Sequence, residues 1–339
     1  MATIGTGSLS LAELIKRENP DGSMADLIDV ISKVTPIANE GYWEGCNNRT
    51  YHEATRVASK PAGTERAYGM GVAAHGAATE KITEPTTMIA DMLVVDADLI
   101  ENEGGASKLN QEEALFVSGM IETVAGRLIS GDRTSYGMQI NGINNRSDYN
   151  SLSSDYVYDN AGGDSSATSN KTSIYIVQYG PKMVSLIAPS GDNSKTIRRR
   201  PFPVELVDES GTSQARKFPA YQTWFQIQFG LFIYDPRCIK RVVNISTTNI
   251  DGVDDFSFDE DLLGDAVIDL EYQGRGAVIY ANRTLMKQMT RRANEMPRGN
   301  FQLAVGADTG MPVSGKVLSF MGIPVHREDS ITDAQAYVV

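Results

Sequence analysis

The fold is decided by the stretch Asn110-Gln-Glu-Glu-Ala-Leu-Phe-Val-Ser-Gly-Met-Ile-Glu-Thr-Val-Ala-Gly-Arg-Leu-Ile-Ser-Gly131, which predicts one uninterrupted helix. Asn110 and Glu113 have the spacing of a capping box at its start, and Gly131 marks its end. One side of the helix is apolar, at Val117, Met120, Ile121, Val124, Ala125, Leu128 and Ile129. At a rise of about 1.5 Å per residue the helix is about 30 Å long, so it can brace a whole domain.

Two small residues of this helix, Gly119 and Gly126, lie seven residues apart and therefore on nearly one face. Because glycine has no side chain, another backbone can approach that face closely. We expect the face to receive a sheet, or an arm of the same or an adjoining chain. On the pattern alone, an ordinary amphipathic helix packed on a sheet is the simpler interpretation.

The composition is that of a globular protein, with 339 residues of which 41% are hydrophobic and 22% charged. The length allows about two domains, and no segment reaches the ~18 apolar residues of a membrane span. The net charge of −12 argues against wide contact with nucleic acid, because phosphate neutralisation needs clustered Lys and Arg. Nine carboxylates between Asp251 and Glu271, with no Lys or Arg among them, predict a solvated face. A cation site is the alternative there, although the spacing of a calcium loop is missing.

Two features indicate a protein that stays in the cytoplasm where it is made. Residues 1–17 lack the basic region and the continuous apolar block of a secretory signal. Cys46 and Cys238 lie far apart in the sequence, which predicts two structural thiols in a reducing compartment and not a disulfide or metal site.

The N-terminal half contains two segments that lack a core of their own. Residues 8–35 predict two short helices, which must dock on their own domain or on a neighbouring chain to be stable. Thr50–Val57 and Lys81–Val95 predict the two strands of a long ribbon, joined by the glycine-rich Ser59–Thr79. The tip is poor in large apolar side chains, which suggests a partner chain. Its candidate subunit contacts are Lys60, Glu65 and Arg66.

The rest of the chain predicts further strands and helices, and so an α+β fold. Tyr221–Phe229 is the clearest strand, because apolar residues alternate with polar ones along it. The other expected strands are residues 173–179, 183–188, 231–234, 239–245, 277–280, 323–326 and 336–339, and the other expected helices are residues 259–270 and 282–294.

Two segments come close to known binding or catalytic motifs, but each lacks a residue that the chemistry needs. Gly310–Val317 nearly matches a phosphate-binding loop but has Val317 where a Ser or Thr must reach magnesium. His52-Glu53 begins like a zinc-protease helix but lacks the second histidine, and no nucleophile motif is present. The sequence therefore predicts no catalytic, cofactor or metal site. The basic cluster Arg198-Arg199-Arg200 indicates a solvated loop or a subunit contact with an acidic surface such as 251–271, with nucleic-acid contact as the third option.

Five segments, colinear along nearly the whole chain, resemble the major capsid proteins of short-tailed (podovirus-like) bacteriophages. The longest is Trp224-Phe-Gln-Ile-Gln-Phe-Gly-Leu-Phe-Ile-Tyr-Asp-Pro-Arg-Cys-Ile-Lys-Arg-Val-Val-Asn-Ile245, and the others are 8–22, 173–181, 281–284 and 321–325. Pro236 departs from the pattern, since an aromatic residue is expected there, and this leaves the local strand boundary open.

The resemblance implies the Hong Kong 97-type fold of tailed-phage shells. Its parts map here to an N-terminal arm (residues 1–47), an extended loop (48–98), a peripheral domain (99–186 and 313–339) with a spine helix (110–131), and an axial domain (187–312). A lattice suits the arm and ribbon, because a neighbouring subunit supplies the contacts that they lack.

The implied function is structural: hexamers and pentamers of the chain form an icosahedral head around double-stranded DNA, which is not bound sequence-specifically. Portal and scaffolding proteins, and a cement or decoration protein, are the implied partners, and the implied location is the virion capsid after assembly in the host cytoplasm. Two alternatives stay open, namely an encapsulin-like compartment shell and a soluble enzyme with an unrecognised site.

Overall fold

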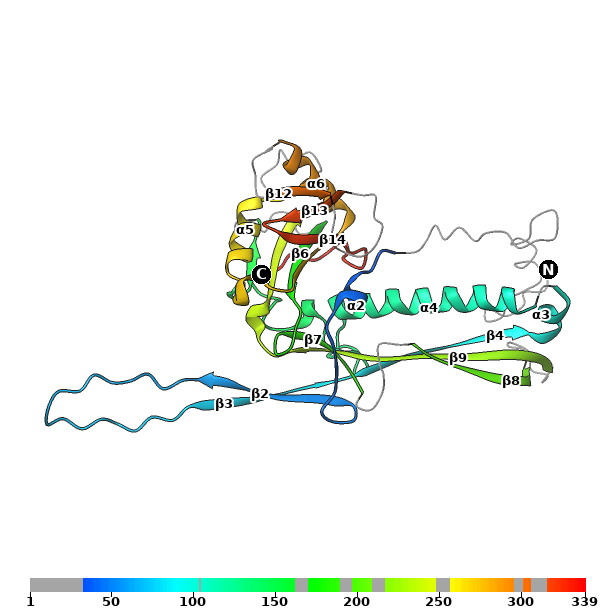
Figure 1. The fold of residues 1–339 in the computed structure, drawn as a ribbon, viewed down its shortest axis with the longest axis horizontal. Coiled ribbons are helices and arrows are strands. Elements are labelled where there is room, and N and C mark those ends of the chain that lie inside the picture. Colours follow the sequence, from blue (N-terminus) through cyan, green and yellow to red (C-terminus); the bar gives the residue numbers. More distant parts are fainter. Residues whose placement is uncertain are drawn as a thin grey trace.

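A computed structural model describes residues 33–103, 105–161, 170–189, 197–208, 217–247, 257–295, 301–305 and 316–339. The molecule is elongated: a long helix lies along one sheet, a second sheet with two helices stands beside them, and a two-stranded ribbon projects away (Figure 1). The expected helices within residues 8–35 and the near-match at Gly310–Val317 lie almost wholly outside the described residues.

The long helix is α4 (Gly105–Ser130), which follows the short helix α3 (Ala97–Glu103). Its predicted apolar side is confirmed: five of the seven side chains are buried, and Val117 and Ile121 pack against them. The predicted start at Asn110 is wrong, because the helix begins at Gly105. Glu113 is not a capping residue, since its carboxylate instead accepts hydrogen bonds from the sheet below.

The sheet under α4 consists of β1 (Trp43–Gly45), β4 (Thr87–Asp96), β7 (Val184–Ala188), β8 (Arg198–Asp208) and β9 (Lys217–Ile233). Strand β9 is central, because β4, β7 and β8 all pair with it. The predicted alternation along β9 is confirmed: Thr223, Phe225, Ile227 and Phe229 are buried. Phe225 stacks on Phe116 of α4, with ring centroids 6.1 Å apart.

The second sheet has seven strands in the order β12-β13-β14-β11-β6-β10-β5. Their bounds are Val157–Asp159 (β5), Lys171–Gln178 (β6), Ile239–Ser246 (β10), Ala277–Ala281 (β11), Phe301–Val305 (β12), Lys316–Phe320 (β13) and Ile323–Arg327 (β14). Helices α5 (Glu260–Ile268) and α6 (Arg283–Glu295) contribute residues to the hydrophobic core on one face of this sheet. Tyr175 and Val177 of β6 belong to the other core, which α4 shares. Burial on both faces explains why β6 is apolar throughout its middle.

Short helical turns connect these elements. They are α2 (Ile37–Glu40) before β1, and the 3-10 turns η1 (Ile143–Asn145), η2 (Pro236–Cys238) and η3 (Glu271–Gly274). Turn η2 lies at the position where Pro236 departs from the family pattern, and it separates β9 from β10. Pro236 therefore lies at the point where the chain passes from the first sheet to the second.

The ribbon consists of β2 (Tyr51–Ser59) and β3 (Ala78–Pro85), which pair antiparallel. The prediction of one strand over Lys81–Val95 is wrong, because β3 ends at Pro85 and β4 begins at Thr87 in another sheet. Between them, the backbone N–H and the hydroxyl of Thr86 both donate to the Thr50 carbonyl, at 2.8 and 2.9 Å. Sequence periodicity reports an extended segment but not its pairing partner.

Strand pairing groups the chain differently from the expected domain boundaries. Strands β8 and β9, which fall in the range 187–312, pair with β4 under α4, whereas β5, β6, β13 and β14 belong to the seven-stranded sheet. The predicted strand at 336–339 is wrong, because residues 336–339 form no strand. This end of the chain bonds to loops and side chains, as when the Val338 N–H donates to Asn244 Oδ1 at 2.9 Å.

Candidate assembly surfaces

The ribbon tip, residues 60–77, is exposed at every position and projects beyond the paired part of β2 and β3 (Figure 1). Lys60, Glu65 and Arg66 all lie on it, as predicted from the sequence. Three apolar side chains on the tip are also exposed, namely Tyr68, Met70 and Val72. The described residues of the subunit do not cover them, so the tip presents both charge and apolar area to a neighbouring chain.

Arg146, which follows η1, anchors the ribbon to the body of the subunit. Its Nη1 lies 2.6 Å from Glu84 Oε1 on β3, and both side chains are about 85% buried, with 14% and 15% exposure. The same guanidinium donates from Nη2 to the Leu231 carbonyl at 2.9 Å and from Nε to the Asn141 carbonyl at 3.2 Å. One side chain therefore ties the ribbon, the loop after α4 and the end of β9 together.

A second anchor lies at the start of β2. The Asn47 side chain donates from Nδ2 to the Glu53 carbonyl at 2.6 Å and accepts from the Glu53 N–H at 2.9 Å. The Asn47 side-chain amide thus closes the turn between β1 and β2 with two hydrogen bonds, as a paired backbone residue would. Together with Arg146 on the β3 side, this turn fixes the direction in which the ribbon leaves the subunit.

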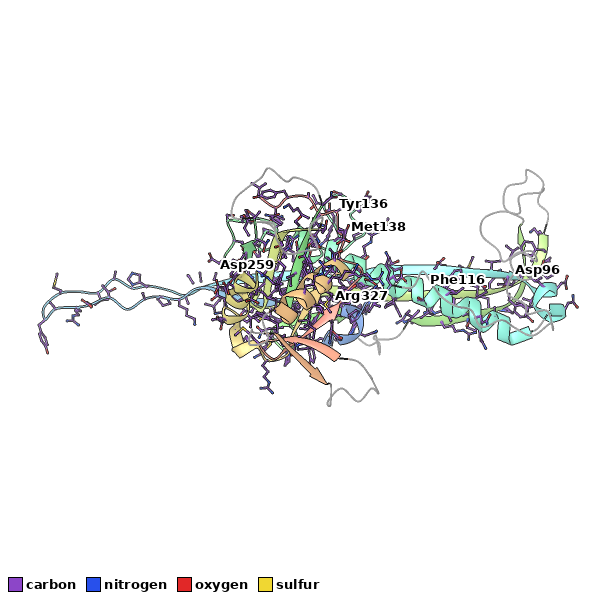
Figure 2. All side chains as sticks on the ribbon, turned by 90° about the horizontal axis from the view of Figure 1, so that it is seen from above. Asp96, Phe116, Tyr136, Met138, Asp259 and Arg327 are labelled. Atoms are coloured by element: carbon purple, nitrogen blue, oxygen red, sulfur yellow. The ribbon has the colours of Figure 1, made fainter. Side chains whose placement is uncertain are left out.

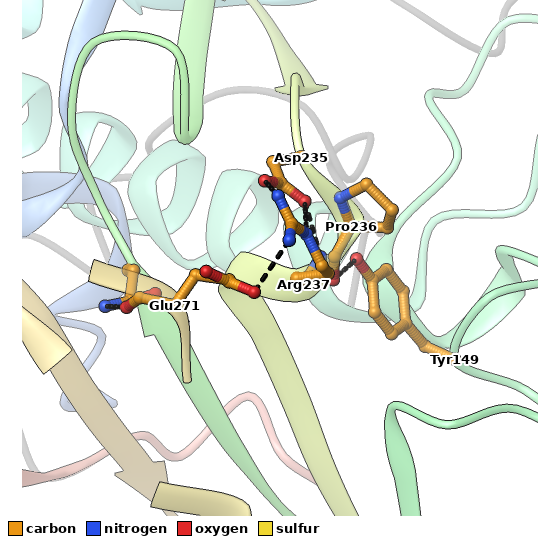
Figure 3. A network of polar contacts seen from close by, with 6 residues as sticks. Tyr149, Asp235, Pro236, Arg237 and Glu271 are labelled. Atoms are coloured by element: carbon orange, nitrogen blue, oxygen red, sulfur yellow. Dashed lines mark hydrogen bonds and ion pairs between the residues drawn. The ribbon is translucent and has the colours of Figure 1, made fainter. Parts of the chain in front are cut away.

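A cleft of about 1140 Å³ lies between the ribbon base and residues 234–237. Its charged lining is mixed, from Arg56, Lys60, Glu80, Lys182, Asp235 and Arg237. Figure 3 shows Arg237 held between Asp235 and Glu271, with Nη2–Oδ2 and Nη1–Oε1 distances of 2.7 Å each. Burial opposes ionisation of Asp235, but the bonds from Arg237 outweigh it, so the pKa of Asp235 is lowered. The cleft is suited to charged side chains of either sign.

No part of the chain that the structure describes covers the face of the first sheet that points away from α4. Met88 and Met92 of β4 lie opposite Gln228 and Trp224 of β9, and both methionines are exposed. On the other side of β9, Phe202 of β8 is exposed as well. We call this set of residues the open sheet face. Its apolar and amide side chains form a surface that another chain can cover.

The three arginines predicted as one cluster lie on two faces of β8. Arg198 and Arg200 pair with Gln226 and Trp224, so they belong to the open sheet face, whereas Arg199 points toward α4. Arg199 binds Glu113 through two bonds, Nε–Oε2 at 2.6 Å and Nη2–Oε1 at 2.7 Å. The period of two along a strand separates these neighbours. Arg199 holds α4 onto the sheet within its own subunit.

We expect Arg199→Ala to lower the free energy of unfolding of the subunit by about 1–3 kcal/mol, because the buried Glu113 carboxylate then keeps only the Thr223 hydroxyl, 3.1 Å away. Urea unfolding of unassembled subunits measures this change. Arg200→Ala is the matched control on the opposite face, with an expected effect within about 0.5 kcal/mol. Equal effects of the two substitutions would contradict the assignment.

The two helix glycines lie beside open space in the subunit. A Cβ added at Gly119 or Gly126 would meet no atom of the described residues within 4 Å outside the helix itself. Gly119 borders a groove of about 490 Å³ between α4 and β4, whose lining includes Ile89, Leu115 and Phe116. Figure 2 shows Phe116 along this elongated half of the molecule. The close approach of a second backbone to the glycine face therefore stays a prediction.

The structure supports the interpretation of the cysteines as structural thiols. Cys46 and Cys238 are free and buried, and burial raises the pKa of their thiols to about 11 and about 12. Within the described residues, no group of three or more His, Cys, Asp and Glu side chains is placed to hold a metal ion. In that same part of the chain, no helix has the length and apolarity needed to cross a membrane.

Comparison with known proteins finds a family and several structures to which the chain is similar. The model of a family described as major capsid protein GP7 matches residues 19–339. A chain of the solved structure of bacteriophage Epsilon15 is similar over 100% of this chain and 99% of its own, with a TM-score of 0.72 and 24% identity. The two chains therefore share a fold.

Two more distant structures are similar to the chain. A chain of the bacteriophage JBD30 capsid is 12% identical, with a TM-score of 0.37 and coverage of 89% of this chain and 93% of its own. An encapsulin of Synechococcus elongatus PCC 7942 is 9% identical, with a TM-score of 0.42 and coverage of 71% and 98%. No curated protein matches the sequence.

Proposed function

The chain belongs to the major capsid protein GP7 family, and we propose that it assembles as hexamers and pentamers into an icosahedral head around double-stranded DNA. It is a structural protein of the virion capsid and not an enzyme. Copies of the chain form the shell, and its α+β fold is the Hong Kong 97 type of tailed-phage capsids.

In this proposal the ribbon of one subunit lies on the open sheet face of the next. The observation that carries it is the exposure of Tyr68, Met70 and Val72 on an extension that has no core. Met88, Met92 and Phe202 supply an uncovered apolar surface on the same chain. Because every subunit carries both surfaces, each can give its ribbon and receive another. Such a head-to-tail contact forms a ring when the rotation between neighbouring subunits closes.

Charge supports a shell that encloses DNA without gripping it. The net charge of −12 gives weak electrostatic attraction to phosphates, so packed DNA stays free to leave. Portal and scaffolding proteins, and a cement or decoration protein, are the further partners in this proposal. Assembly takes place in the host cytoplasm.

The domain assignment is part of the proposal. Residues 1–47 are the arm and residues 48–98 contain the extended loop, as the resemblance implies. Strand pairing favours a peripheral domain of α4 with β4, β7, β8 and β9, and an axial domain of the seven-stranded sheet with α5 and α6. The ranges 99–186 with 313–339, and 187–312, are thereby redistributed between the two domains.

The test replaces the apolar tip and leaves the rest of the chain intact. We expect Tyr68→Ser with Met70→Ser to weaken assembly by about tenfold or more, because a buried Tyr or Met contributes roughly 1.5–3 kcal/mol. Shell yield by sedimentation and electron microscopy, at several subunit concentrations, measures the change. Arg66→Glu on the same tip should also lower the yield.

The matched control changes the same two residue types elsewhere. Tyr136 and Met138 are exposed on the loop after α4, at the side of the molecule in Figure 2. Tyr136→Ser with Met138→Ser should leave both assembly and subunit stability unchanged. Wild-type assembly of the tip variant, or equal losses in the two double variants, would refute the proposed ribbon contact.

A further inference from the structure

His52 is a buried histidine at the root of an otherwise exposed ribbon. It is the second residue of β2 and only 5% exposed, whereas β2 becomes exposed from Val57 outward. Its ring packs edge-on against Phe232 and Tyr234 at the end of β9, with centroid distances of 4.6 and 5.6 Å. The ring therefore joins the first turn of the ribbon to the first sheet.

The hydrogen bonds around the ring define its protonation state. The Asn47 backbone N–H points at Nδ1, 3.3 Å away, so Nδ1 must accept and carries no proton. On the other side Nε2 lies 2.7 Å from the Tyr234 hydroxyl, which in turn donates to Glu44 Oε2 at 2.9 Å. A hydroxyl that donates to Glu44 is free to accept from Nε2–H. The arrangement is complete only with a neutral imidazole.

We propose that His52 is a proton-sensitive clamp, which holds the ribbon root while neutral and releases the turn between β1 and β2 when protonated. A protonated ring has N–H groups at both nitrogens, so Nδ1–H would face the Asn47 N–H donor to donor. That turn also depends on the Asn47 amide, which pairs with Glu53. Loss of one bond therefore loosens the start of β2.

Several ionisable groups face the ring from the surrounding elements. Glu44 of β1 reaches it through Tyr234 after β9, and the Cys46 thiol lies in the turn. Glu84 of β3 is the cross-strand partner of His52 and is paired with Arg146. Because Arg146 neutralises Glu84, Glu44 is the one carboxylate among these that favours a charged ring.

The burial of the His52 ring outweighs its attraction to the Glu44 carboxylate. It lowers the pKa of His52 below its ordinary value, although Glu44 acts in the opposite direction. The unfolded or released turn then binds a proton more tightly than the clamped one, so clamping is fully present above about pH 6.5 and weakens as the pH falls below it. The Glu84–Arg146 pair does not involve the imidazole, so acid frees the β2 side of the ribbon before the β3 side.

Hydrogen–deuterium exchange of the full-length unassembled subunit tests the clamp. Backbone exchange at residues 46–57, corrected for the intrinsic effect of pH, should accelerate by up to about tenfold for each pH unit below 6.5. His52→Gln offers an acceptor and a donor that do not titrate, so its exchange should not respond to pH. The chain has three histidines, and His75→Gln on the exposed tip and His326→Gln on β14 should both keep the wild-type response.

If His52→Gln loosens the turn at every pH, a second measurement on the wild-type chain tests whether His52 is the titrating group. Exchange of the imidazole carbon-bound hydrogen in the wild-type chain gives a titration midpoint for each histidine. The midpoint of His52 should fall below about 6.5, the ordinary pKa of a histidine. A His52 midpoint at or above that value, or a wild-type turn whose corrected exchange ignores pH, would overturn the inference.

Discussion

Arg146→Ala is expected to lower the free energy of unfolding of the subunit by about 3–5 kcal/mol, the cost of breaking a buried ion pair from one side. Glu84 would be left as an unpaired carboxylate with 15% exposure. The carbonyls of Leu231 and Asn141 would lose their donors at the same time. The loss therefore exceeds that of a single surface contact.

The matched control lies further along the same ribbon. Arg56 and Glu80 form an ion pair at 2.9 Å, but their side chains are 36% and 53% exposed. Arg56→Ala should therefore change the free energy of unfolding by about 1 kcal/mol or less. Denaturant titration of both variants, with proteolysis of the ribbon as a local probe, measures the difference. Arg146→Ala would disprove the anchoring role if it were no more harmful than Arg56→Ala.

The elements that the sequence predicted best are those that bury one face and repeat apolar residues at a regular spacing. Phe225 and Ile227 alternate with glutamines on β9, and Val124 and Leu128 repeat along α4, so a single period reveals each element and its buried face. The ribbon was predicted from the opposite signal. Its tip is rich in glycine and alanine, and a segment without a core of its own needs a partner.

Pairing partners and long-range polar contacts could not be predicted. The extended run through Thr86 gives no sign that β3 belongs to the ribbon and β4 to the first sheet. The contact between Arg199 and Glu113 joins residues far apart in the sequence, so it left no local pattern. Arg199 was therefore predicted only as part of a basic cluster. In the sequence, His52 belongs only to an incomplete zinc-protease motif. Its place in the predicted strand Thr50–Val57 is the other signal, and it is weak.

Close backbone contacts around Gly131, at the end of α4, predict a second large loss of subunit stability. A Cβ at Gly131 would lie 2.5 Å from the Arg127 carbonyl oxygen and 2.6 Å from that of Ile140. Both are backbone atoms, so the chain itself must move. Such overpacking costs about 1–3 kcal/mol, and displacement would also strain the bond from the Gly142 N–H to the Gly131 carbonyl, which is 2.8 Å long. We expect Gly131→Ala to lower the free energy of unfolding by about 3 kcal/mol.

Gly126→Ala is the control, because it makes the same change five residues earlier, inside α4. Its Cβ meets nothing within 4 Å outside the helix, and alanine favours a helix interior over glycine by roughly 0.5–1 kcal/mol. The subunit should therefore become slightly more stable, as thermal denaturation would show. A destabilised Gly126→Ala subunit would contradict this account of the helix end.

The same variant also separates two roles of the glycine face. If a neighbouring arm packs on Gly119 and Gly126 in the shell, Gly126→Ala should assemble less well although its subunit is more stable. Opposite signs in stability and assembly are the expected result, because an added methyl group blocks only contacts that form between subunits. Shell yield that rises with stability would assign the glycines to the helix alone, and the face would then be solvent-exposed in the capsid.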